Sequence, residues 1–183
     1  YRLGEEAVVY ASFGQGYKSG GFNGEVANNV THYQDEGLFI AETVDAYEIG
    51  YKGLLTTNMS VEAAAFYQDY AHPQARIFVQ FPLPGGGSIT SNSLSNLDAA
   101  TVQGVDLSAV WTPFEGLEVR GGAVVMDTEI KQGTDASGSA NAATFDGNPL
   151  PFASDVSATL AIRKEWAVGA DRQASIEVNA KYQ

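Results

Sequence analysis

The feature that most constrains this chain is a strict alternation of apolar with small or polar residues, clearest between Val102 and Val125. The alternate apolar positions in this stretch are Val105, Leu107, Ala109 and Trp111, then Leu117, Val119, Ala123 and Val125. A period of two predicts strands that each have one apolar face. Pro113 and Gly116 interrupt the pattern where the chain must reverse, because proline cannot donate to a ladder and glycine tolerates a positive φ. The stretch is therefore predicted to form an antiparallel hairpin.

The positions between these apolar residues carry mostly small side chains with an occasional charge, and a tryptophan closes the apolar stripe near the turn. This combination is typical of a strand pair from a membrane barrel, which has lipid outside and a crowded polar lumen inside. A soluble β-sandwich that acts as a binding module is the alternative, since the same stripes could face a core between two sheets.

The same period of two recurs in five other segments of the chain. They cover residues 7–17, 43–55, 60–70, 156–166 and 175–182. The segment 60–70 has an aromatic residue on both faces, and we place Glu62 and Gln68 with the polar residues. The seven predicted strands have about the nine to eleven residues that a tilted transmembrane strand requires.

The predicted connections are alternately long and short along the chain. Irregular structure is expected over about residues 18–42, 71–97 and 127–152, whereas the other turns are tight. In an up-and-down sheet this puts every long loop at one rim and every short turn at the other, as in outer-membrane barrels. Three aromatic residues on the apolar parity are predicted to form an aromatic girdle at a membrane interface. They are Trp111, Trp166 and Tyr51.

Composition narrows the possible functions. The formal net charge is -12, so nucleic-acid binding, which needs clustered basic residues, is excluded. The chain has no cysteine and therefore neither a disulfide nor a thiolate metal site. No apolar run approaches the roughly 18 residues of a spanning helix, so a membrane would have to be crossed by strands. The first residues contain neither an initiator Met nor a signal peptide, and the last interrupt a strand pattern, so we expect a piece of a longer protein.

No catalytic or metal site is predicted. The two histidines, His32 and His72, lie in or beside predicted loops, and neither has a Gly-x-Ser-x-Gly context. The candidate calcium ligands of the third predicted loop, Asp135, Ser137 and Asp146, lack the spacing of an EF-hand, and the carboxylates are expected to be solvated. Only geometry could reveal a Ser-His-Asp arrangement, and a barrel enzyme is therefore the third hypothesis after the transporter and the sandwich.

Several groups of residues carry a resemblance to a known family. They are Tyr10–Asn23, Glu42–Lys52, Ala63–Tyr70, Gly104–Leu107 with Trp111–Pro113, and Asn148–Phe152. Their sequences, order and spacing resemble the C-terminal barrel of TonB-dependent outer-membrane receptors, which transport ferric siderophores and related scarce nutrients.

The resemblance implies that residues 1–183 form part of a twenty-two-stranded barrel in the outer membrane of a Gram-negative bacterium. It implies four partners: outer-membrane lipid, an N-terminal plug domain of the same protein, TonB acting through that plug, and a ferric siderophore or similar small ligand. No cofactor is expected, and neither the plug nor the segment that TonB contacts is expected within these residues.

Charged residues on the predicted polar face are compatible with a translocation lining. The stronger explanation is that these charges are paired simply because a packed lumen cannot leave them unsatisfied. These predicted lumen-facing residues are Glu48, Lys52, Glu62, Asp106, Glu118, Arg120 and Arg163.

Ligand contact is predicted at the outer rim, where the first long loop gathers aromatic residues and a cation. The predicted ligand-binding residues are Tyr17, Lys18, Phe22, Asn23, Tyr33 and Phe39. Rigid aromatic rings can stack on the organic arms of an iron chelate. The alternative for each residue is ordinary loop packing, or girdle placement in the case of Tyr17.

Overall fold

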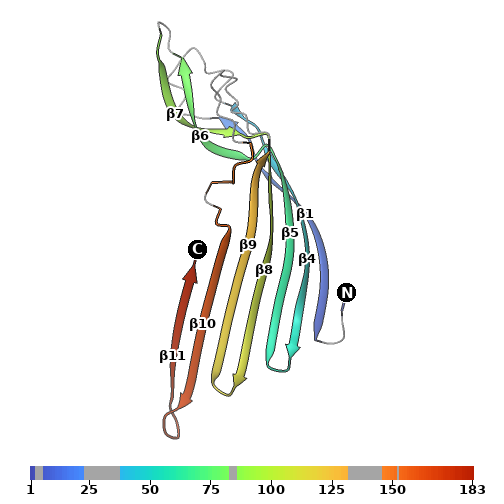
Figure 1. Cartoon of the computed structure of the whole chain (residues 1–183), viewed down its shortest axis with the longest axis vertical. Coiled ribbons are helices and arrows are strands. Elements are labelled where there is room, and N and C mark those ends of the chain that lie inside the picture. The colour runs from blue at the N-terminus through green and yellow to red at the C-terminus, as the bar shows by residue number, and fades with distance from the viewer. Residues whose placement is uncertain (3–5, 23–37, 83–85, 132–145, 152) are drawn as a thin grey trace.

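A computed structural model describes residues 1–2, 6–22, 38–82, 86–131, 146–151 and 153–183 (Figure 1). The strands are β1 (Ala7–Lys18), β2 (Gly21–Phe22), β3 (Leu38–Phe39), β4 (Glu42–Thr56), β5 (Met59–Ala71), β6 (Gln74–Pro82), β7 (Ser88–Asn96), β8 (Ala99–Phe114), β9 (Leu117–Lys131), β10 (Val156–Ala167) and β11 (Gln173–Tyr182). Within these ranges, no helix has the length and apolar character needed to cross a membrane.

Seven long strands form one antiparallel sheet in the order β1-β4-β5-β8-β9-β10-β11. Figure 1 shows these strands side by side in a single layer, with the tight turns at the lower end and the β6–β7 hairpin at the upper end. The predicted antiparallel, up-and-down, all-β architecture is confirmed, as is the alternation of long and short connections. We call the two ends the short-turn rim and the long-loop rim.

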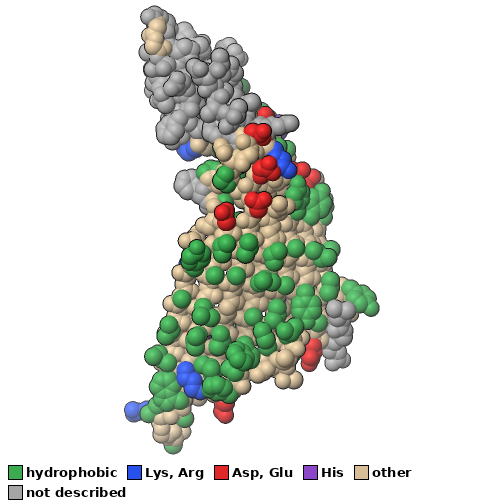
Figure 2. All heavy atoms as spheres, in the orientation of Figure 1, with side chains coloured by type: hydrophobic (Ala, Val, Ile, Leu, Met, Phe, Trp, Pro, Cys, Tyr) green, Lys and Arg blue, Asp and Glu red, His purple; other side chains and the backbone are tan. Residues whose placement is uncertain are grey.

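The register gives the sheet two chemically different faces. Leu107 pairs with Ala63 on one side and Ala123 on the other, and this rung continues to Tyr51 and Val9. We call this side the apolar face. Figure 2 shows it covered with hydrophobic side chains between the two rims.

The large side chains of the apolar face remain exposed, and in the described residues no second sheet covers them. A sandwich would bury these side chains between two sheets. The described residues therefore do not form a β-sandwich.

The second long connection differs from the prediction, because most of it is a hairpin. The ladder of β5 and β8 continues through His72 and Leu97, whose amides donate to Asp98 and Pro73, into β6 and β7. His72 has a positive φ of 56°, and Pro73 follows it. The sequence of β7 is rich in Ser and Asn and has no apolar stripe, so periodicity could not reveal this pairing.

Several strands also extend beyond their predicted ends. The pairing of β8 with β9 reaches Ala99 and Lys131, whereas the apolar alternation of β9 stops at Val125. Above that level, polar residues such as Asp127 and Glu129 take the apolar parity. The ladder therefore continues past the apolar band, and hydrophobic periodicity reports only the part within the band. The two-residue ladder of β2 with β3 was likewise unpredictable from so short a pattern.

The buried core is small and lies at the long-loop rim. Leu97, Ala100 and Ile130 are almost fully buried there. The segment that returns from the third long connection covers the upper edge of β9, where Ile130 N donates to Asn148 O over 2.8 Å and Leu150 N donates to Thr128 Oγ1 over 2.9 Å. This segment contains the Asn-Pro-Leu-Pro motif and continues into β10.

Candidate functional site

The opposite side of the sheet, which we call the polar face, carries all seven charged residues that were predicted to share one side. Glu48 pairs with Phe66 and Ser12, while Lys52 pairs with Glu62, which pairs with Ser108. Asp106 lies one rung above Ser108 on the same face. Further along the sheet, Glu118 pairs directly with Arg163, and Arg120 lies one rung above Glu118.

Short contacts link most of these charges. Lys52 Nζ lies 3.0 Å from Glu62 Oε2, and Arg120 Nε lies 2.9 Å from Glu118 Oε1. Arg163 forms an ion pair with Glu165. Five of the seven charges thus form exposed ion pairs, and each exposed pair contributes only about 0–1 kcal/mol to stability.

Aromatic rings lie flat against glycines on this face. A Cβ added to Gly50 would come within 2.4 to 2.5 Å of the Tyr10 ring, and one added to Gly104 would lie 2.7 Å from the Phe66 ring. The Tyr10 hydroxyl donates to Glu48 Oε1 over 2.6 Å, which holds the ring across the neighbouring strand. Glycine at these positions therefore lets large rings cover the strand without projecting far from the wall.

These residues surround a shallow hollow of about 250 Å³ on the polar face. Its lining includes Tyr10, Glu48, Lys52, Glu62, Phe66 and Asp106. The hollow offers an excess of carboxylate over ammonium groups, so it favours cationic or hydrogen-bond-donating groups. Among the residues that the structure describes, no cluster of three or more metal-ligating side chains is found.

A junction of polar side chains ties the first long connection to the second at the long-loop rim. Asn96 Oδ1 accepts from the amide of Ile40 over 2.8 Å, and Asn96 Nδ2 donates to the carbonyls of Ile40 and His72. Gln74, the ladder partner of Asn96, donates from Nε2 to Ser19 O and Ile40 O, each over 3.0 Å. Gln74 and Asn96 were not predicted from the sequence, because isolated amides in predicted loops carry no periodic signal.

The structure separates two of the predicted ligand-binding residues. Tyr17 follows the parity of the apolar face and is 73% exposed, whereas the adjacent Lys18 falls on the polar parity, opposite Glu42. Consecutive residues of a strand point to opposite sides, so these two cannot contact one ligand together. Phe22 is exposed and Phe39 packs its ring on Gly21. Asn23 and Tyr33 lie outside the described residues.

The aromatic residues of the apolar face lie near both of its ends. Trp111 and Trp166 lie a few residues before their short turns, and the Tyr51 hydroxyl points towards the same rim, 3.4 Å from Leu54 O. Towards the long-loop rim, Phe13, Tyr47 and Tyr67 form a row, with ring centroids 5.1 and 6.5 Å apart. This second row was missed, although its members occupy the apolar parity of three successive predicted strands.

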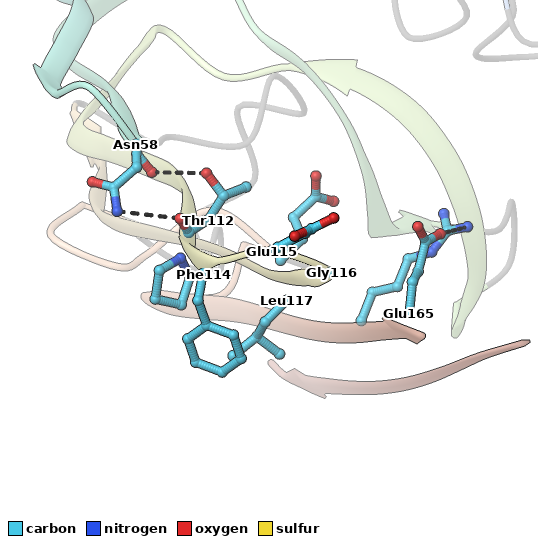
Figure 3. A pocket seen from close by; sticks show the side chains of 10 residues that line it. Asn58, Thr112, Phe114, Glu115, Gly116, Leu117 and Glu165 are labelled. Carbon is cyan, nitrogen blue, oxygen red and sulfur yellow. Dashed lines mark hydrogen bonds and ion pairs between the residues drawn. The ribbon is translucent and has the colours of Figure 1, made fainter. Parts of the chain in front are cut away.

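A second hollow, of about 510 Å³, lies at the short-turn rim between the β4–β5 and β8–β9 turns and β10 (Figure 3). Figure 3 shows two hydrogen bonds between Asn58 and Thr112: the Thr112 hydroxyl donates to Asn58 O, and Asn58 Nδ2 donates to Thr112 O, each over 3.2 Å. The amide of Glu165 donates to Gly116 O over 2.6 Å. The positive φ of 73° at Gly116, and the 2.4 Å that would separate a Cβ there from Glu165 O, require glycine at this contact.

Comparison with solved structures shows the same fold in outer-membrane receptors. The chain matches the ferric yersiniabactin uptake receptor FyuA of Yersinia pestis with a TM-score of 0.64 and 22% identity, over 92% of this chain and 22% of that one. It matches the siderophore receptor PiuA of Acinetobacter baumannii with a TM-score of 0.61 and 19% identity, over 90% of this chain and 22% of that one. It matches the ferric-catecholate import receptor Fiu of E. coli K12 with a TM-score of 0.59 and 19% identity, over 99% of this chain and 23% of that one. The chain thus spans a little over a fifth of the length of these receptors.

The family assignment covers almost the whole chain. Residues 1–182 match the family described as TonB dependent receptor-like, beta-barrel. The single antiparallel sheet, its apolar face and its long and short connections agree with a portion of such a barrel. The chain therefore belongs to the β-barrel family of TonB-dependent receptors and is part of an outer-membrane protein of a Gram-negative bacterium.

Proposed function

We propose that this chain forms part of the barrel wall of a receptor that imports a ferric siderophore or a similarly scarce nutrient, energised through TonB. The observation that carries the proposal is the family match over residues 1–182, together with a sheet whose two faces suit lipid and a polar lumen. The similar receptors named above are described as siderophore or ferric-chelate receptors, which supports this ligand class.

In this proposal the polar face lines the lumen and meets the N-terminal plug domain of the full-length protein. Its excess of carboxylates and its flat aromatic rings suit contact with a folded polar surface rather than an open aqueous pore. The ion pairs then give the charged groups of the lumen face a partner when the plug displaces water. We propose no bond-making chemistry for this part of the barrel.

Ligand contact is proposed at the long-loop rim, from the first long connection. Lys18 on the polar parity can face an anionic chelate, and Phe22 and Phe39 offer rings from the β2–β3 ladder. Tyr17, on the parity of the apolar face, is instead assigned to the lipid side. The hydrogen bonds of Gln74 and Asn96 fix both ends of this connection, so its ends are held in place while the segment between them meets the ligand.

Uptake of radiolabelled ferric siderophore into cells that carry the full-length receptor tests the proposal. Uptake is expected with TonB present and is expected to be lost without it, while a heat-modifiability gel shows the same amount of folded barrel. Deletion of residues 24–37 is expected to lower affinity for the chelate without changing that amount. Uptake that persists without TonB would refute the energisation, and unchanged affinity after the deletion would refute the loop assignment.

A further inference from the structure

Lys164 is a basic residue within the apolar face. It pairs with Leu117 on β9 and with Ile176 on β11, and Trp166 follows on the same side of β10. The basic residues Arg120, Arg163 and Lys181 of these strands fall on the polar face, whereas Lys131 has the parity of the apolar face but lies at the long-loop rim, beyond the apolar band. Lys164 is thus a cation in a surface that otherwise suits hydrocarbon, and such residues are expensive in a membrane unless their charged end reaches the headgroups.

The β8–β9 turn holds the ammonium group of Lys164 in place. Lys164 Nζ donates to Glu115 O over 3.0 Å and lies 4.9 Å from the centroid of the Phe114 ring. A Cβ added to Gly116 would lie 3.4 Å from the same Nζ, so the missing side chain leaves room for it. The carbonyl takes one of three ammonium donors, and within the described part of the chain no carboxylate lies within ion-pair distance of Lys164.

This ammonium lies near the short-turn end of the apolar face, beside an interfacial tryptophan. Trp166 is 46% exposed one rung further towards the turn, and Arg172 lies beyond it, paired with Val168. The long-loop end of the same parity carries the carboxylates Asp45, Asp69, Asp127 and Glu129 beside the cation Lys131. Figure 2 shows more Asp and Glu side chains at the upper end of this face than at the lower end, and Lys or Arg side chains at both ends.

We propose that Lys164 binds the phosphate of a glycerophospholipid in the leaflet that meets the short-turn rim. The remaining donors of a pre-positioned ammonium complement a phosphate, and Trp166 and Phe114 flank it where amphipathic rings favour the headgroup level. At the other end of the face the four carboxylates outnumber the cation Lys131 and disfavour phosphate, so the site is assigned to the leaflet at the short-turn rim. The inference depends on the placement of the apolar face in the membrane and not on the ligand that the receptor carries.

Native mass spectrometry of the purified full-length receptor, titrated with dioleoylphosphatidylglycerol in detergent, tests this site. The Lys164→Gln receptor is expected to need about a fivefold higher concentration of phosphatidylglycerol to retain its tightest-bound phospholipid, because it has lost one cation near an anionic headgroup. Lys164→Arg keeps the charge and is expected to behave like the wild type. Lys181→Gln, which removes a cation from the polar face, is the matched control and is expected to leave retention unchanged.

Dioleoylglycerol, which has the same acyl chains and no phosphate, separates headgroup binding from apolar packing. It is expected to bind the wild type and Lys164→Gln equally. The proposal is overturned if phosphatidylglycerol retention is equal in these two proteins, if dioleoylglycerol shows the same loss, or if Lys181→Gln causes an equal loss. A wrong membrane placement would appear separately, as a missing heat-modifiable band in the wild type.

Discussion

Replacement of Leu107 by arginine is expected to destabilise the full-length receptor in a bilayer, because Leu107 lies at the middle of the apolar face. On β8 it is four residues from Gln103, where polar residues begin, and four from Trp111 near the turn. Four residues correspond to about 13 Å along a strand, or about 10 Å along the membrane normal at a tilt of about 40°. A guanidinium at this depth reaches neither interface without local thinning of the bilayer.

The expected cost of Leu107→Arg is about 2 to 4 kcal/mol, the range measured for arginine at a bilayer midplane. That corresponds to a fall in the folding equilibrium constant of about thirtyfold to about a thousandfold. Ser108→Arg, one residue away, is expected to cost much less, because Ser108 lies on the polar face and pairs with Glu62. Leu107→Ala separates the loss of apolar area from the added charge.

Reversible denaturant unfolding of the receptor from lipid vesicles measures these differences. Folded and unfolded fractions are read from the shift in gel mobility without heating. Equal costs for Leu107→Arg and Ser108→Arg, or a larger cost for Ser108→Arg, would refute the assignment of Leu107 to the lipid side.

Three further predictions follow from the sheet and its rims. In a receptor without other cysteines, Ser19→Cys should react with an impermeant thiol reagent on intact cells and Thr57→Cys only after the outer membrane is opened; the reverse would invert the topology. Gly50→Ala should lower stability by about 1 to 3 kcal/mol through its clash with the Tyr10 ring. The control Gly14→Ala should be neutral, because a Cβ there has open space around it. The double mutant Gly50→Ala/Tyr10→Ala should lose less stability than the sum of the two single mutants, because removal of the Tyr10 ring relieves the clash. Additive losses in denaturant unfolding would disprove the clash. Asn96→Ala should speed hydrogen exchange at the amide of Ile40, which donates to Asn96 Oδ1, and unchanged exchange would show that the junction does not hold the first connection.

The sequence predicted the part of the fold that lies within the apolar band. Alternation through Leu107 and Val119 identified the strands because each strand there must present apolar side chains on one side only. The same rule placed Asp106 and Arg120 on the other side of the sheet, since neighbouring residues of a strand point to opposite faces. Family resemblance then distinguished a barrel from a sandwich, since both have the same alternation.

The parts that the sequence did not predict lie beyond that band. In the β6–β7 hairpin only the sequence of β6 has an apolar run, whereas that of β7 is rich in Ser and Asn, so no matched pair of apolar stripes predicts the pairing. The junction of Gln74 and Asn96 depends on two segments far apart in the chain that the fold brings together. Lys164 did leave a signal, because it interrupts the apolar parity between Ile162 and Trp166, and such an interruption near a turn indicates a membrane interface.

One face of the sheet is expected to contact lipid and the other to face the lumen. Nitroxide labels placed one at a time at residues 103–110 of β8, in the full-length receptor in vesicles, test this most directly by their collision with oxygen and with a water-soluble nickel complex. We expect a period of two, with residues 105, 107 and 109 accessible to oxygen and residues 104, 106, 108 and 110 not. Accessibility without this period, or with the opposite parity, would contradict it.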